Sequence, residues 1–155
     1  MGAAALGRQD RLQQKMIRLH VVANSDSQRD QALKLQVRDK VLAFTETTMR
    51  AAADRQEANR TLRAALPTIQ AMAEATLREN GCEDRVETRL EPAEFPLKTY
   101  SGFRLPAGEY LALRVVIGEG QGRNWWCVVF PTLCTAATSD EAELRAAAGG
   151  FDEDE

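Results

Sequence analysis

The stretch "EYLALRVVIGEGQGRNWWCVVF" at residues 109–130 contains two strand patterns on either side of a glycine-rich segment. The alternation of side chains before and after residues 118–123 predicts a β-hairpin closed by that loop. In a regular hairpin Ile117 lies opposite Asn124, and one face is then wholly apolar: Leu111, Leu113, Val115, Trp126, Val128 and Phe130. We expect this row to face the core, because a slip of one residue would expose all of it.

The opposite face of the predicted hairpin mixes aromatic, aliphatic and basic side chains: Tyr110, Ala112, Arg114, Val116, Trp125, Cys127 and Val129. Such a composition is typical of surfaces that bind other proteins. We therefore assign Trp126 to the core and Trp125 to a candidate partner-binding face. The alternatives for Trp125 are cover by a proline-rich loop and simple exposure. One bulge in the glycine loop would exchange the two tryptophans.

An alternating segment near the N-terminus, "MIRLHVVANSD" at residues 16–26, predicts a further strand. Its apolar row is expected to face the helices, and Arg18, His20 and Val22 then lie on the mixed side. "NSDS" at residues 24–27 offers helix N-cap residues, and apolar positions recur at helical spacing from Asp30 to about Ala52.

A second helical pattern starts near Gln56, and Pro67 should kink this helix or begin a new one. Gly81 is a plausible left-handed cap at its end. "RVETRLE" at residues 85–91 predicts a half-exposed strand, and residues 92–108 are expected to form a loop with at most one short strand.

The order of these elements predicts an α+β fold. We expect two layers: a mainly antiparallel sheet of three to five strands, with two long helices packed on one face. The expected organisation is a flexible segment at residues 1–15, a single domain at 16–137 and an acidic, disordered tail at 138–155.

Composition excludes several classes of function. The 155 residues are 44% hydrophobic and 28% charged, with a net charge of -3. The last 17 residues hold seven acids against Arg145, which leaves 19 basic and 16 acidic residues elsewhere. A surplus this small does not predict nucleic-acid binding, which needs clustered Lys and Arg. No apolar run reaches the roughly 18 residues of a membrane span.

The sequence contains no defensible catalytic set. His20 is the only histidine and is expected to be structural, although it could serve as general base to a Cys127 nucleophile. The three cysteines and His20 lack the close Cys-x-x-Cys spacing of zinc sites, so we expect neither a metal nor a cofactor. "GEGQG" lacks the Gly-Lys-Ser/Thr of a phosphate-binding loop.

Cys127 and Cys134 are candidates for a disulfide. A chain reversal at residues 131–133 would place them opposite each other, within reach of a disulfide, and Cys82 would remain unpaired. The alternative is that both are small apolar packing residues.

Three motifs in order carry a resemblance to a known family. "HVVANSDS", "LPAGEYLALRVVIG" and "GRNWWCVVFP" lie within residues 16–134, which closely resemble stage II sporulation protein R. The matching positions are His20, Asn24, Ser25, Asp26, Gly108, Arg114, Gly118, Gly122, Asn124, Trp125, Trp126, Cys127 and Cys134. From these and the mixed face we take as candidate partner-binding residues His20, Asn24, Asp26, Tyr110, Arg114, Asn124 and Trp125. "NSD" is also explained as a helix cap.

The resemblance implies a signalling protein without catalysis of its own. Members of the family act between the forespore and mother-cell membranes, where they trigger a membrane-embedded aspartic protease to process the precursor of sigma factor E. The expected partner is that protease, with no nucleic acid and no small-molecule substrate. Family members begin with an apolar export segment, and none precedes Ile17 here, so the expected extracytoplasmic location rests on resemblance. The alternative function is a cysteine- or metal-dependent hydrolase.

Overall fold

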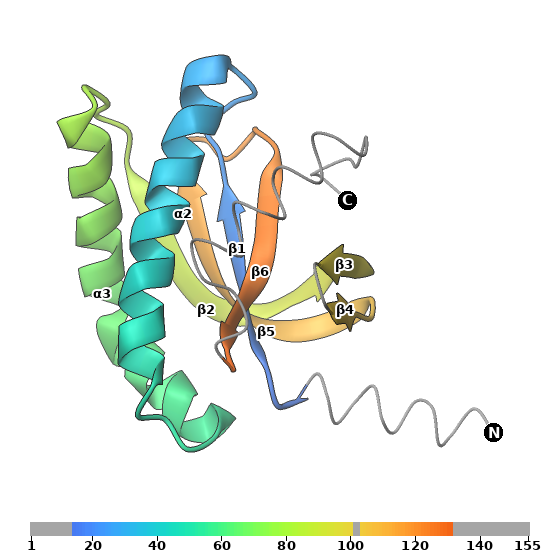
Figure 1. The fold of residues 1–155 in the computed structure, drawn as a ribbon. Helices are drawn as coiled ribbons and strands as arrows, with labels where there is room; N and C mark the ends of the chain where they lie inside the picture. Colours follow the sequence, from blue (N-terminus) through green and yellow to red (C-terminus); the bar gives the residue numbers. More distant parts are fainter. Residues whose placement is uncertain (1–13, 101–102, 132–155) are drawn as a thin grey trace.

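The computed structural model describes residues 14–100 and 103–131. Within these residues the elements are β1 (Ile17–Val22), α2 (Gln28–Met49), α3 (Arg55–Glu79), β2 (Val86–Phe95), β3 (Lys98–Tyr100), β4 (Phe103–Leu105), β5 (Gly108–Ile117) and β6 (Asn124–Phe130). Four strands form a mixed, mostly antiparallel sheet in the order β2-β5-β1-β6, and β3 pairs with β4 as a separate ribbon. Both helices lie on one side of the larger sheet (Figure 1). The predicted two-layer α+β fold is confirmed. The expected tail and N-terminal segment lie largely outside the described residues.

The predicted hairpin between residues 109 and 130 is wrong, because β1 lies between β5 and β6. β1 runs parallel to β5, with Leu19 opposite Leu113, and antiparallel to β6, with Val21 opposite Trp125. The physical reason is burial: β1 is buried at nearly all of its positions and gains a partner on both sides by taking a central place. The loop at residues 118–123 is long enough to step over one strand, a distance of roughly 10 Å.

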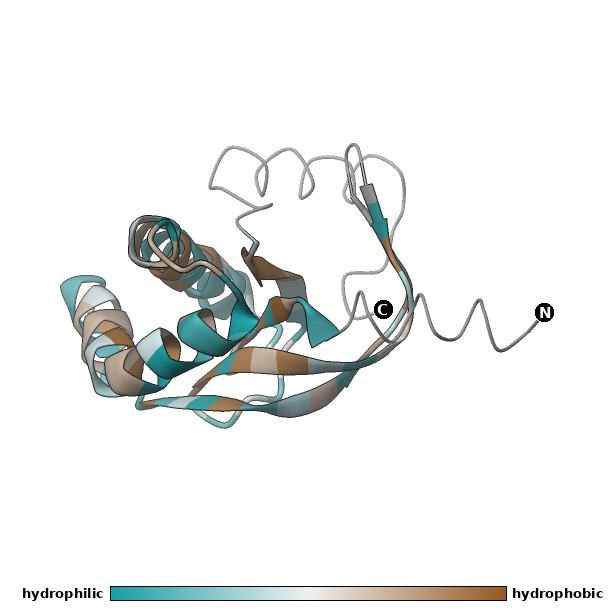
Figure 2. Cartoon of the chain, turned by 90° about the horizontal axis from the view of Figure 1, so that it is seen from below, coloured by the Kyte–Doolittle hydropathy of each residue, from teal (hydrophilic) through white to brown (hydrophobic). Residues whose placement is uncertain are grey.

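The predicted faces of β1 and β5 are correct. Leu19, Leu113 and Val115 are fully buried, and the aligned Thr88 on β2 donates its hydroxyl hydrogen to the carbonyl of Leu66 on α3, at 3.1 Å. This contact identifies the face beneath the helices. Figure 2 shows the helices gathered over that side of the sheet, with apolar residues in the strands below them.

The predicted faces of the two tryptophans are exchanged. Trp125 lies opposite Val21 and therefore faces the helices, where the guanidinium of Arg38 on α2 lies 5.2 Å from its ring centroid. Trp126 lies opposite His20 on the face away from the helices, which we call the open face. The register of β6 is set by pairing with β1 and not by a hairpin loop. It differs by one residue from the predicted register, and one residue exchanges the two faces.

The helices begin close to their predicted positions. Ser27 caps α2 by accepting a hydrogen bond from the backbone N–H of Asp30, at 3.0 Å. α3 continues through Pro67 as a single helix, so no new helix begins there. Pro67 and Arg63 lie on the exposed side, where water can satisfy the carbonyl that proline leaves without a donor. Gly81 has a φ of 76°, which confirms the left-handed cap.

The segment at residues 92–108 is more regular than predicted. β2 continues through Pro92 to Phe95 and pairs with β5 along its whole length. Proline is tolerated because β2 is an edge strand of the sheet, where one side needs no backbone donor. The β3–β4 ribbon follows directly and brings Lys98 back toward the sheet.

Candidate functional site on the open face

A chain of hydrogen bonds crosses the open face from one edge of the sheet to the other. Arg114 NH1 donates to Glu91 Oε2 at 2.9 Å, and Arg114 Nε donates to His20 Nδ1 at 3.2 Å. His20 Nε2 then lies 2.8 Å from Asn124 Oδ1. The four residues come from β2, β5, β1 and β6, in the order of the strands in the sheet. We call this set, Glu91, Arg114, His20 and Asn124, the polar ladder.

The ladder fixes the tautomer of His20. A guanidinium has only donors, so His20 Nδ1 must accept, and the proton lies on Nε2, which donates to the Asn124 carbonyl oxygen. Burial lowers the pKa of His20 to about 4, the hydrogen bond to Asn124 opposes this shift, and the nearby charge of Arg114 adds to it. The imidazole is therefore neutral at physiological pH.

Aromatic rings cover one end of the open face. Phe95 lies 5.6 Å from Tyr110, 6.2 Å from Trp126 and 6.1 Å from His20, measured between ring centroids. Arg18, which is fully buried, places its guanidinium 4.2 Å from the Phe95 centroid and 4.7 Å from that of Tyr110. We call Arg18, Phe95, Tyr110 and Trp126 the ring cluster.

The aromatic residues of the ring cluster extend the hydrophobic core to the sheet face away from the helices. The hydroxyl of Tyr110 donates to the carbonyl of Pro106 at 2.6 Å, and Lys98 Nζ lies 4.7 Å from the Trp126 centroid. The Lys98 contact holds the β3–β4 ribbon against the sheet, and the Tyr110 hydrogen bond fixes the turn that follows β4. Tyr110, a predicted contact residue, is on the expected face but almost fully buried.

The other end of the open face is covered by the loop between β5 and β6. Gly120 lies so close to Val116 that an added Cβ would be 2.6 Å from its Cγ1, and Val22 is 3.7 Å from the same point. The polar ladder therefore crosses the strip between this loop and the ring cluster.

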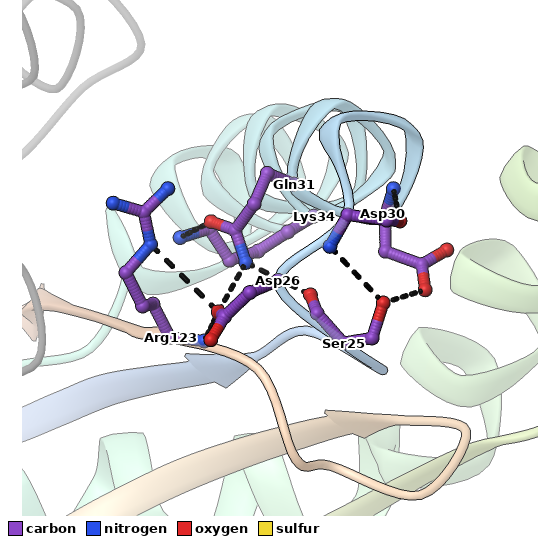
Figure 3. A network of polar contacts seen from close by, with 7 residues as sticks. Ser25, Asp26, Asp30, Gln31, Lys34 and Arg123 are labelled. Carbon is purple, nitrogen blue, oxygen red and sulfur yellow. Dashed lines mark hydrogen bonds and ion pairs between the residues drawn. The ribbon is translucent and has the colours of Figure 1, made fainter.

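The β1–α2 loop fixes the β5–β6 loop in place. Asn24 Oδ1 accepts from the backbone N–H of Glu119 at 2.9 Å, and Asp26 Oδ1 accepts from that of Arg123 at 2.8 Å. Figure 3 shows Asp26 between Arg123 and Gln31 at the start of α2. We call these contacts the loop clamp. Asn24 and Asp26 thus have a structural use, and their contact with a partner stays a prediction.

Asp30 completes this network on the helix side. It accepts hydrogen bonds from Ser25 Oγ at 2.5 Å and from Asn24 Nδ2 at 2.9 Å. The hydrogen bonds from Ser25 and Asn24 lower the pKa of Asp30, so its carboxylate stays charged beside the N-terminus of α2.

Three of the predicted contact residues come together in the ladder: His20, Arg114 and Asn124. Trp125 lies instead beneath α2, which corrects its expected place on the open face. Sequence reasoning missed Glu91. Its alternation with Leu90 placed it on an outward row, but only the pairing of β2 with β5 shows that Arg114 is its neighbour.

The structure bears on the cysteine prediction only in part. Cys127 is disulfide-bonded, pairs with Leu19 and faces the helices, whereas Cys82 is free and buried. Cys134 lies outside the described residues, so the Cys127–Cys134 bond stays a prediction. Counting reactive thiols on denatured protein would test it.

Within residues 14–100 and 103–131, no three His, Cys, Asp or Glu side chains are grouped so that they could hold a metal ion. None of the helices described there is long and apolar enough to cross a membrane.

The fold and the open face define a class of protein: a two-layer α+β domain with a prearranged polar strip on the sheet face away from its described helices. The family model described as stage II sporulation protein R matches residues 13–140, and the chain belongs to this family. Stage II sporulation protein R of Bacillus subtilis (strain 168) is 42% identical over 118 residues, which is 76% of this chain and 53% of the relative. The chain thus spans about half the length of that relative. No solved structure matches it. The family gives the protein a role in sporulation.

Proposed function

We propose that this protein is an extracytoplasmic signalling ligand. It acts between the forespore and mother-cell membranes, binds a membrane-embedded aspartic protease and activates it to process the precursor of sigma factor E. The observation that carries the proposal is membership of the stage II sporulation protein R family across most of the chain.

The geometry of the open face supports a binding role. The two helices of the described residues cover one side of the sheet, and the other side presents the polar ladder between two covered ends. Its charged and amide side chains hold one another in fixed positions, so a partner would meet a surface that needs little reordering.

The geometry disfavours the alternative of a cysteine hydrolase acting through His20 and Cys127. Cys127 faces the helices, whereas the His20 ring lies on the open face with both nitrogens engaged by Arg114 and Asn124. A general base needs a ring nitrogen within reach of the nucleophile.

The proposal is tested in a host that does not sporulate but produces the membrane protease and the sigma factor precursor. This chain is supplied either with an export signal or without one, and the processed fraction of the precursor is measured by immunoblot. We expect processing only with the exported chain. Equal processing by the retained chain, or none by a folded exported chain, would contradict the proposal.

A strain without the protease is the control. Processing there would mean that the chain cleaves the precursor itself, which would favour the hydrolase alternative.

A further inference from the structure

Arg114 occupies the centre of the open face and keeps part of its guanidinium available. Its side chain is 32% exposed, and its described hydrogen bonds use Nε and NH1. Among the described residues, the NH2 group of Arg114 has no partner. An arginine in this state presents donors in a fixed plane, an arrangement that suits a carboxylate.

Two neighbours hold that plane in position. His20 accepts from one side of the guanidinium, and Glu91 accepts from the other. The contact with His20 requires the neutral imidazole, which burial secures by lowering its pKa. A mobile surface arginine loses side-chain entropy when it binds a partner. Arg114 has lost most of that entropy before the partner binds, because its neighbours already hold it.

The surroundings of Arg114 are those of an energetically important contact. The ring of Trp126 stacks beside His20 at 5.7 Å, and the loop over Val116 closes the other side. Arginine and tryptophan in a partly desolvated setting are the residues that most often dominate binding.

We propose that Arg114 is the central contact residue of the partner-binding surface and that it binds a carboxylate side chain of the partner protein. This inference rests on the proposed function and names the chemistry by which the partner is recognised. His20 positions Arg114 and does not itself contact the partner.

Arg89 provides a matched control. It lies directly opposite Arg114 in the β2–β5 pairing and on the same face, but it is 55% exposed. Its ion pair with Glu87 is 3.0 Å long, and its contact with Glu91 of the ladder is longer, at 3.9 Å. An exposed ion pair of this kind contributes little, so its loss should have a small effect.

The test measures binding of the detergent-solubilised membrane protease to the immobilised chain. We expect Arg114→Gln to weaken binding by roughly tenfold or more and Arg89→Gln by less than about twofold. Binding by the wild-type chain should weaken as salt rises from about 50 mM to about 300 mM, and Arg114→Gln should flatten this dependence because a charged contact is lost.

Glu91→Gln separates contact from mere structure. It removes the negative charge that competes with a partner carboxylate, while the amide oxygen can still accept from Arg114 NH1 and hold the guanidinium, so binding should stay equal or become tighter. If Arg114 only stabilised the sheet, loss of the Glu91 ion pair would weaken the ladder and reduce binding, as Arg114→Gln does. Thermal melting shows whether Arg114→Gln folds. If it does not fold, Glu91→Gln still tests whether Arg114 contacts the partner.

Each outcome has a distinct meaning. No binding by the folded wild-type chain would overturn the proposed function and, with it, this inference. Binding by the wild-type chain with equal affinity in Arg114→Gln, or with equal losses in Arg114→Gln and Arg89→Gln, would overturn the role of Arg114 alone. Salt-independent binding would mean that a neutral carbonyl, and not a carboxylate, meets the guanidinium.

Discussion

The protonation state of His20 follows from its place in the sheet. Its strand lies between two others, so the ring is held between Arg114 on one side and Asn124 on the other. The sequence shows only a histidine in an alternating segment. The charge of the residue depends on neighbours that are more than 90 positions away.

We expect this histidine to make the stability of the protein depend on pH. Its pKa is about 4 in the folded chain against 6.5 when unperturbed, so between these values the unfolded state binds more protons. The stability it contributes is fully present above pH 6.5 and is lost as pH falls toward about 4, by on the order of 3 kcal/mol.

Urea unfolding of the wild-type chain and His20→Gln, at about pH 7 and about pH 4.5, measures this effect. The wild-type chain should lose more stability than the variant. Asp30, whose pKa the fold also lowers, is present in both chains, so its contribution cancels in the comparison. A parallel loss in the two proteins would mean that His20 is not held neutral by the fold.

Both tryptophans are expected to be structural. Trp125 is 6% exposed beneath α2, and Trp126 is 9% exposed in the ring cluster. Replacing either by alanine should destabilise the domain by about 3–5 kcal/mol, because each change leaves a cavity. Thermal melts should show similar losses for both, whereas Leu97→Ala, at an exposed position, should change little. Full stability of Trp125→Ala would restore the surface position first expected for it.

At the level of elements, the β5–β6 loop is the decisive connection. It passes over one end of β1 and is held there by the loop clamp, so β6 can pair with β1 from the far side. The glycines of this loop are required for steric as well as conformational reasons. An added Cβ at Gly122 would lie 2.3 Å from the carbonyl oxygen of Ser25.

A comparison of Gly118 with Gly81 separates the steric effect of an added side chain from the effect of backbone conformation. Both have positive φ, 57° and 76°, so alanine at either should cost about 1–2 kcal/mol in backbone strain. Gly81 has open space around it, but a Cβ at Gly118 would lie 2.3 Å from Asn24 Oδ1. Gly118→Ala should therefore be clearly more destabilising than Gly81→Ala in urea unfolding. Equal losses would mean that the loop clamp contributes nothing beyond backbone conformation.

Across the whole molecule, β1 is the structural centre. It is flanked by a strand on each side, and Leu19 and Val21 are fully buried beneath the helices. The β3–β4 ribbon pairs only three residues with three and is attached to the sheet through contacts such as that of Lys98 with Trp126. Stability should therefore differ strongly between these regions.

Hydrogen exchange should show this difference. We expect the backbone amides of Leu19 and Val21 to be among the last to exchange, in global unfolding, and that of Thr99 to exchange early by local opening. Protection of the ribbon equal to that of β1 would contradict this order and would make the ribbon part of the central folding unit.

Much of this protein followed from its sequence because local patterns report local physics. Alternation placed Leu113 and Val115 toward the helices and Arg114 away from them, helix caps located α2, and the glycine at 81 marked a left-handed turn. Each of these features depends on neighbours a few residues away, and the periods of strand and helix record them. The motifs also predicted the family that the comparisons confirm.

The strand order, and with it the candidate site, came only from folding in three dimensions. A strand pattern states which side chains share a face but not which strand lies alongside, so the insertion of β1 between β5 and β6 left no local signal. That insertion sets the register of β6, places Trp126 instead of Trp125 on the open face, and aligns Glu91, Arg114, His20 and Asn124. The ladder takes one residue from each of four strands. The order of these strands follows from the burial of β1, which is greatest when β1 pairs on both sides.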